Sequence, residues 1–169
     1  LVTVKGSAVV DENIEVLLGY MMHPKSNERI KRHIIAHGST ERTCTYDYKT
    51  HTLHATAELT APLIANRRFS GTQTWQKGCD GNPSTYVIAG LPDVVSDDTK
   101  GKGSTSKAVL ASTTPLYVLE TLGLRVTRIT QLQQIDLKLD GIIGEIITNY
   151  ATKFSFGILK KLYEKYQRR

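Results

Sequence analysis

The chain has 169 residues, of which 40% are hydrophobic, and its formal charge is +6. This length suits one domain with a buried core, and no apolar run reaches the roughly 18 to 20 residues of a membrane-spanning helix. Basic residues are concentrated in the last part of the chain, where residues 141–169 carry +4 of the total. This distribution favours contact of one end with an anionic surface and argues against a nucleic-acid groove spread across the fold.

The cysteines and the first residues predict the cellular compartment. Cys44 and Cys79 form no C-x-x-C pair, and the only Asn-x-Ser arrangement is cancelled by Pro83. Residues 1–10 lack the charged and apolar regions of a signal peptide. We therefore expect a cytoplasmic domain with two unpaired thiols. Because the sequence does not begin with Met, we also expect it to be part of a larger multidomain protein.

The first half of the chain predicts strands around one short helix. Leu1–Val10 alternates as a strand does, and Asp11 is the expected N-cap of a helix that ends before Pro24. Glu41–Lys49 is the next expected strand. In Leu53–Ala61, apolar residues alternate with polar ones, which is typical of a half-buried strand with one wet face.

The second half predicts longer strands in hairpin order. The expected strands are Arg67–Lys77, Ser84–Leu91, Ala108–Leu122 and Leu124–Leu137. The turn cluster GCDGNP lies between the first two of these strands, and the Gly-rich segment Ser96–Ser106 is expected to be a loop. About six antiparallel strands in this order favour one curved sheet.

A long amphipathic helix is predicted from Asp140 to Arg169. Its apolar residues recur at spacings of three and four: Ile143, Ile147, Tyr150, Phe154, Ile158 and Leu162. A curved antiparallel sheet cannot bury its inner face alone, and only this helix is long enough to cover it. The expected fold is therefore α+β, with the sheet wrapped around the C-terminal helix. Small residues on the strands, such as Ala55, Ala57 and Ala89, would leave a cavity.

The sequence offers no clear catalytic or metal-binding constellation. His33 and His37 have the i, i+4 spacing of a zinc site on a helix, but no third ligand is placed near them. The carboxylates are scattered, and neither cysteine sits in a motif that would activate it. We therefore expect no metal, no cofactor and no enzymatic activity.

Three features favour a ligand. The loop at Pro62, Leu63 and Ile64 is apolar where a connection should be polar, and Trp75 is expected in a core or an interface. The strand Arg125–Leu137 has polar residues on both faces, which requires water or a polar ligand group on one of them. The candidates for lining such a wet interior are Arg128, Gln131, Gln133 and Gln134.

Several stretches resemble one family, the START (steroidogenic-acute-regulatory-related lipid transfer) domains of the helix-grip, Bet v 1-like superfamily. The similar stretches are APLIANRRF with QTW from Ala61 to Trp75, the strand after Pro83, TRITQLQQIDLK from Thr127, and the closing helix with IIGEIITN and FSFGILKKL. The family's acidic residue after the arginine is here Arg68. The resemblance also leads us to expect that the family's N-terminal helix and first strand are absent from this sequence.

The resemblance implies that residues 1–169 form a single START-like domain that encloses one lipid in a hydrophobic tunnel. It implies a gate loop at Pro62, Leu63 and Ile64 and a lid formed by the C-terminal helix. The expected cavity-lining residues are Tyr86, Ile88, Arg128, Gln131, Tyr150 and Phe154. The expected membrane-facing basic residues are Lys160, Lys161 and Lys165.

The predicted function is non-catalytic binding of a phospholipid, a sterol or a similar lipid, for lipid transfer or sensing at membranes. The domain is expected to be a monomer that contacts an anionic membrane surface peripherally, without nucleic acid. Two alternatives stay open at this point. One is an enzyme of the same fold, similar to polyketide cyclases or hydrolases, and the other is a protein-interaction module without a cavity.

Overall fold

The computed structural model describes residues 1–23, 30–31, 35, 41–60, 65–78, 81–93, 108–139 and 144–167, with the side chains of 41, 59 and 144–154 left aside. Within these ranges, one strand and a short helix come first, six consecutive strands follow, and a long helix closes the chain, in the order that the sequence patterns predict. The strands are β1 (Val2–Val10), β2 (Glu41–Asp47), β3 (Thr52–Leu59), β4 (Arg67–Lys77), β5 (Thr85–Pro92), β6 (Val109–Gly123) and β7 (Val126–Asp136). The helices are α1 (Ile14–Met22) and α3 (Gly144–Tyr166).

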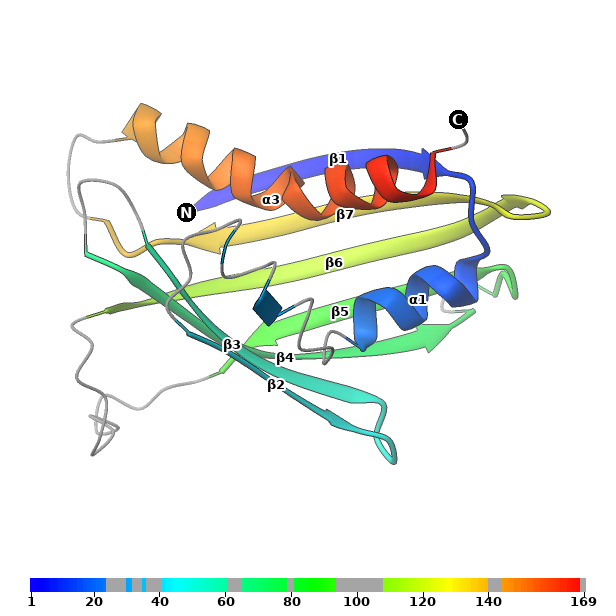
Figure 1. Ribbon diagram of the computed structural model, residues 1–169, viewed down its shortest axis with the longest axis horizontal. Helices are drawn as coiled ribbons and strands as arrows, with labels where there is room; N and C mark the ends of the chain where they lie inside the picture. Colours follow the sequence, from blue (N-terminus) through cyan, green and yellow to red (C-terminus); the bar gives the residue numbers. More distant parts are fainter. Residues whose placement is uncertain are drawn as a thin grey trace.

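The strands form one seven-stranded sheet in the order β1-β7-β6-β5-β4-β3-β2 (Figure 1). Neighbours in this order are antiparallel, as hairpin connections require. The pairing of β1 with β7 joins distant parts of the chain, with Val2 opposite Ile135 and Val10 opposite Thr127. Beyond the end of β5, the first residues of β4 pair directly with β6. This pairing is parallel, and it begins with Arg67 opposite Val109.

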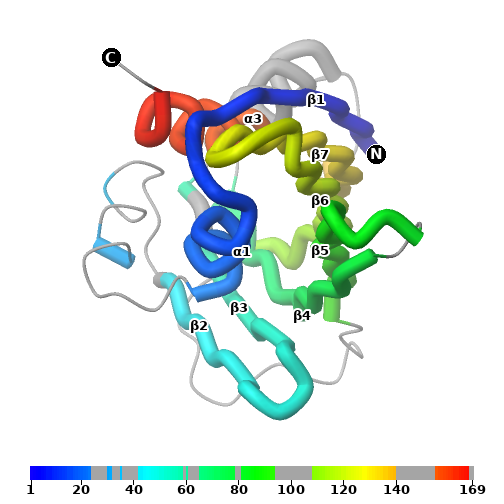
Figure 2. Tube along the Cα trace, turned by 90° about the vertical axis from the view of Figure 1, so that its right-hand side faces the viewer, coloured from blue at the N-terminus to red at the C-terminus, as the bar shows by residue number. Residues whose placement is uncertain are grey.

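Both helices lie on the concave side of the sheet (Figure 2). The α3 helix runs along β1 and β7, while α1 lies farther down the sheet, next to β5 and β6 in the view of Figure 1. The predicted curved antiparallel sheet with a long C-terminal helix over its inner face is confirmed. The helix thus covers apolar surface that the sheet cannot bury alone.

The junction between β1 and α1 differs from the prediction by two residues. The N-cap of α1 is Asn13, whose side-chain oxygen accepts a hydrogen bond from the backbone N–H of Glu15 at 2.8 Å. The prediction of Asp11 as the N-cap is wrong, because α1 begins only at Ile14. The backbone N–H of Asp11 instead donates to the carbonyl of Tyr166 at 3.0 Å, which ties the end of α3 to the start of α1.

A glycine on β1 allows α3 to approach the sheet closely. A Cβ atom added to Gly6 would lie 2.2 Å from Cε1 of Phe156 and 3.1 Å from Cδ1 of Leu159. The aromatic ring of Phe156 therefore occupies the space that any other residue at this position would fill. Gly6 fixes the distance between the helix and the edge of the sheet.

Candidate functional site

Side chains from both helices and from most of the strands form an apolar cluster, which we call the apolar end. It contains the buried face of α1 and the second half of α3, where Leu159 is 5% exposed and Leu162 0%. The sheet contributes Val10, Tyr46, Leu53, Tyr86, Ile88, Tyr117, Leu119 and Ile129. A second, smaller cluster lies farther along β7 and contains Phe69, Ala111, Ile135 and Leu137. Among the described residues, the two clusters are separate.

Polar side chains separate these clusters on β7. Alternation along the strand turns Ile129, Gln131, Gln133 and Ile135 toward the helices, and all are buried. Gln131 is opposite Tyr117 on β6, and Gln133 is opposite Pro115. We call Thr113, Tyr117, Gln131, Gln133 and Ser155 the polar belt, because they interrupt the apolar lining at the level of Gly6.

The amide of Gln131 is the centre of the polar belt. Its Nε2 donates to the carbonyl oxygen of Ser155 on α3 at 2.9 Å and to Oε1 of Gln133 at 2.7 Å. Gln133 in turn donates to the hydroxyl of Thr113 at 2.7 Å. The Oε1 atom of Gln131 is buried and has no hydrogen-bond donor in the described part of the chain. A buried amide acceptor without a partner costs about 1–3 kcal/mol, so this atom is well suited to accept a hydrogen bond from a ligand.

Tyr117 adds a phenol to the same belt. Its side chain is 6% exposed, and burial raises the pKa of the hydroxyl well above its usual value. It therefore stays a neutral phenol, able to donate and to accept a hydrogen bond. No described residue of the polar belt carries a charge, so the belt suits an uncharged polar group.

Charged residues gather instead at the start of β4. Arg67 is 5% exposed, and its Nε donates to the carbonyl of Leu137 at 2.7 Å while Nη1 binds the carbonyl of Ala65. Arg68, which stands where START domains have an acidic residue, pairs with the buried Glu58 at 3.5 Å. Backbone carbonyls thus satisfy the buried guanidinium of Arg67, and a partner on the neighbouring strand replaces the expected acidic residue.

The predicted cavity residues divide between the two faces of the sheet. Gln131 is in the polar belt, and Tyr86 and Ile88 are buried at the apolar end, 6% and 0% exposed. The prediction for Arg128 is wrong: it is exposed on the convex face, with Nη1 3.7 Å from a carboxylate oxygen of Glu120. Arg128 is three residues from Gln131, and residues an odd number apart on a strand point to opposite faces.

Other residues predicted to shape the cavity also face outward, and several lie outside the described residues. Gln134 is exposed on the convex face with Arg128. Ala89 is exposed on the same face, so its small side chain does not create space inside the fold. Gly90 is small because Pro115 and Gln73 pack against it, at 2.8 and 2.9 Å from an added Cβ. The side chains of Tyr150 and Phe154, the loop at Pro62, Leu63 and Ile64, and the pair His33 and His37 lie outside the described residues.

Comparison with known proteins shows the fold. No protein-family model matches the sequence, and no curated protein matches it in sequence. Among solved structures, the chain is similar to the lipid transfer and protein localization domain of human StarD13 (DLC2), with a TM-score of 0.66 and 16% identity over 99% of this chain and 78% of that one. The chain has a START/Bet v 1-like helix-grip fold.

Two further helix-grip structures support this result. Human STARD10 superposes with a TM-score of 0.70 and 15% identity over 96% of this chain, which spans 62% of STARD10. Human StAR-related lipid transfer protein 5 gives 0.66 and 13% identity over 96% of this chain and 76% of that one. At such low identity these likenesses establish the helix-grip architecture and leave the ligand open.

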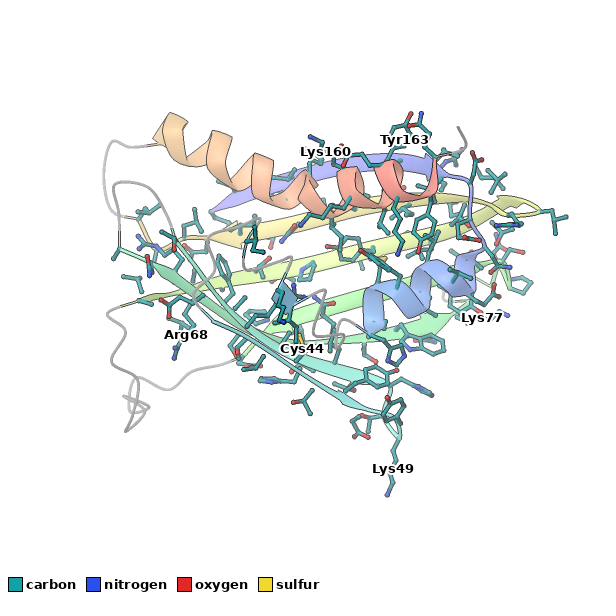
Figure 3. The ribbon with its side chains drawn as sticks, viewed as in Figure 1. Cys44, Lys49, Arg68, Lys77, Lys160 and Tyr163 are labelled. Atoms are coloured by element: carbon teal, nitrogen blue, oxygen red, sulfur yellow. The ribbon has the colours of Figure 1, made fainter. Side chains whose placement is uncertain are left out.

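The basic residues of the closing helix of this helix-grip fold are not equivalent. Lys160 and Tyr163 point away from the sheet (Figure 3), and Lys160 lies 3.7 Å from Glu164 in an i, i+4 pair. Lys161 is also exposed. Lys165 instead packs over the ring of Tyr20 at 4.1 Å from its centroid, a cation–π contact that joins α3 to α1. None of the described helices is both long enough and apolar enough to cross a membrane.

A polar cluster on the convex face of the helix-grip sheet has the residue types of a catalytic triad but not its connections. Asp93 receives hydrogen bonds from His54 Nε2, at 2.8 Å, and from the hydroxyl of Ser70. A serine nucleophile requires its hydroxyl to face the imidazole, whereas Ser70 donates to the carboxylate. Among the described residues no group of three or more His, Cys, Asp or Glu could hold a metal ion.

The sequence did not predict a pocket of about 280 Å³ beside α1. Its lining comes from one face of the helix, from β2, from the turn before β3 and from β4. The lining residues are Glu15, Leu18, Gly19, Met22, His23, Tyr46, Tyr48, His51 and Trp75. Only Trp75 was singled out by sequence, because the other residues come from segments whose contact depends on the tertiary fold.

Proposed function

We propose that this chain is a non-catalytic lipid-binding domain that encloses one lipid between the concave face of the sheet and α3. The polar belt is the observation that carries the proposal. It places a buried acceptor, Oε1 of Gln131, which has no donor in the described part of the chain, between two apolar clusters. Ligand pockets combine mostly apolar walls with a few polar groups that fix orientation, and this arrangement has both.

The chemistry of the polar belt favours a lipid with an uncharged hydrogen-bond donor, such as a hydroxyl or an amide N–H. Such a donor would satisfy the Gln131 acceptor, and the phenol of Tyr117 is opposite it on the neighbouring strand. Burial of acyl or ring surface would supply most of the affinity, at about 25 cal/mol per Å². We propose Tyr86, Ile88, Tyr150 and Phe154 as further lining residues.

Loading of the lipid requires an opening and a membrane. We propose that Pro62, Leu63 and Ile64 form a gate that opens at the bilayer, because apolar residues in this loop would face acyl chains at low cost. Lys160 and Lys161 are exposed on α3 and would contribute about 1 kcal/mol each near an anionic surface. The domain would thus act in the cytoplasm as a monomer in peripheral contact with membranes.

The names of two structural neighbours support a lipid ligand. The StarD13 structure is a lipid transfer and protein localization domain, and another neighbour is a lipid transfer protein. Lipid transfer by this chain is a proposal that rests on the shared helix-grip architecture and on the polar belt. Sensing of a lipid without transfer would use the same interior.

Native mass spectrometry of the protein purified from cells, followed by identification of any released lipid, tests the proposal. A defined mass excess is expected in the wild type and in a Gln134→Leu variant, because Gln134 is exposed on the convex face. The matched Gln131→Leu variant should lose lipids that carry a hydroxyl or an amide N–H. A bare protein mass that persists after incubation with mixed liposomes would overturn the proposal.

A further inference from the structure

The pocket beside α1 has walls made mainly of rings. Along the helix, Glu15, Leu18, Gly19, Met22 and His23 share one face at spacings of three and four. Among the described residues, four rings face this helix side: Tyr46 on β2, Tyr48 just after β2, His51 in the following turn and Trp75 on β4. In Figure 3, the labelled Lys49 marks this turn and Lys77 the end of β4.

The rings contact one another around Tyr46. The Tyr46 hydroxyl accepts a hydrogen bond from Trp75 Nε1 at 3.4 Å and lies 3.4 Å from Nδ1 of His51. The ring centroids of His23 and Tyr46 are 4.3 Å apart, and those of Tyr46 and Tyr48 are 4.9 Å apart, edge to face. These contacts hold the rings in place before a ligand arrives, which lowers the entropic cost of binding.

The electrostatics of the pocket favour a positive charge. The faces of aromatic rings are negative and attract cations. Among the described lining residues, Glu15 is the one charged residue when the imidazoles are neutral, and none of these residues is Lys or Arg. The Glu15 carboxylate is held near the rings by the Tyr86 hydroxyl, which donates to Oε1 at 3.4 Å. Lys77 lies outside this lining, over the ring of Tyr86 at 5.4 Å from its centroid.

We propose that this pocket binds a quaternary ammonium group, either in a small free molecule or as the headgroup of a choline lipid. Such cations are weakly hydrated, and cages of aromatic rings recognise them. The volume of about 280 Å³ lies just below the roughly 300–1,000 Å³ of common ligand pockets, which suits one small group. The described lining contains no residue of α3 or of the polar belt, so the site goes beyond the proposed function.

Trp75 provides the measurement, because it is the only tryptophan in the chain. We expect choline, added to the purified protein, to change the tryptophan emission saturably. The uncharged analogue of choline, in which carbon replaces the nitrogen, has the same shape and should leave the emission unchanged. Dihexanoyl phosphatidylcholine, used as monomers, distinguishes the two sources of the cation. Tighter binding of this lipid than of choline assigns a headgroup, and equal binding assigns a free molecule.

Two matched pairs of variants assign the effect to the pocket. An added Cβ at Gly19 meets nothing within 4 Å, so Gly19→Leu should fill the pocket and abolish the choline response without loss of fold. Gly19→Ala intrudes less and should retain binding. Glu15→Gln should weaken choline binding roughly threefold to fivefold, whereas Glu164→Gln, an equal loss of charge on the exposed side of α3, should not weaken it. The melting temperature of each variant reports whether the fold is intact.

Three results would overturn the proposal. One is the absence of a saturable response to both choline and the choline lipid. Another is an equal response to choline and to its uncharged analogue, which would indicate an apolar pocket without preference for charge. The third is full choline binding by a folded Gly19→Leu variant, which would place the ligand elsewhere.

Discussion

The apolar end and the polar belt lie on the same concave face, yet they are built for different tasks. At the apolar end, Leu119, Ile129 and Leu162 are each 0% exposed and belong to one core cluster with the buried face of α1. In the polar belt, one turn of α3 away, Ser155 contacts a glutamine instead of a leucine. The same strand, β7, supplies both regions through the same alternation. The difference therefore comes from two residues, Gln131 and Gln133, and not from a change of backbone.

This comparison indicates where the fold gets its stability and where it keeps a capacity for binding. Burial of apolar side chains stabilises the folded state by about 25 cal/mol per Å², and the apolar end concentrates such burial under both helices. The polar belt gives up part of that gain and leaves a buried acceptor on Gln131 that has no partner among the described residues. A region that carries such a cost without an evident structural benefit is a candidate for function.

The largest effect is expected at the apolar end. Leu162→Ala removes a side chain that is fully buried against α1 and the sheet, and should lower the free energy of unfolding by about 2–5 kcal/mol. Leu91→Ala, at a position that is 70% exposed, should change it by less than about 0.5 kcal/mol. Urea denaturation measures both variants. Equal effects would show that the apolar end is not the stabilising region.

In the polar belt, a second substitution should restore part of the stability that the first one removes. Gln131→Leu removes the side-chain donor to the Ser155 carbonyl and leaves Oε1 of Gln133 without the donor that it has in the wild type, which should cost about 1–3 kcal/mol. Adding Gln133→Leu removes the acceptor that Gln131→Leu leaves without its donor and should recover part of that loss, because replacing both partners is cheaper than replacing one. A double variant less stable than the sum of the singles would contradict this account. The double-mutant cycle is measured by urea denaturation.

A third substitution tests how closely α3 must approach the sheet beside the polar belt. Gly6→Ala forces its new Cβ against the ring of Phe156 and should cost about 1–3 kcal/mol through overpacking. Gly123→Ala places a methyl group where nothing lies within 4 Å and serves as the control. Thermal unfolding followed by circular dichroism compares the two. Equal stability of the two variants would mean that the helix can shift outward freely.

The sequence predicted the elements better than their contacts. The bounds of β4 agree with the predicted Arg67–Lys77, because the turn cluster GCDGNP that follows the strand is a local signal. The pairing of β1 with β7 is set by contacts more than a hundred residues apart, which no local pattern encodes. Gln131 was identified as an interior residue, whereas Arg128 was not excluded although the period of two places it on the other face.

The pocket beside α1 shows the same limit more clearly. In the sequence, each of its aromatic residues is ordinary for the strand or turn in which it lies. His51, for example, is a turn residue in a left-handed conformation with φ of 53°. Tyr46 and Trp75 are on β2 and β4, two strands that are not neighbours in the sheet. Only the curvature of the sheet and the placement of α1 bring their side chains together. A cluster of this kind has no signature in sequence spacing.

The smallest effect should come from the convex face, which belongs to neither region. Partial burial raises the pKa of Asp93, but hydrogen bonds from Ser70 and His54 and the charge of His54 outweigh it, so the pKa lies below its ordinary value. A lowered pKa in the folded state stabilises the protein above the ordinary aspartate value and loses this contribution as the pH falls through the folded pKa. Solvent screening limits it to less than about 1 kcal/mol.

Asp93→Asn tests this contribution and separates the convex face from the interior. In the variant, stability between pH 5 and pH 3 should fall less steeply than in the wild type, because one carboxylate no longer takes up a proton preferentially in the unfolded state. Binding of lipid or of choline should stay unchanged, since Asp93 contacts neither the polar belt nor the pocket lining. A variant with an unchanged pH profile would show that His54 and Ser70 do not favour the charged carboxylate. A variant with altered binding would show that the two faces of the sheet are coupled. Binding on the concave face would then depend on more than the apolar end and the polar belt.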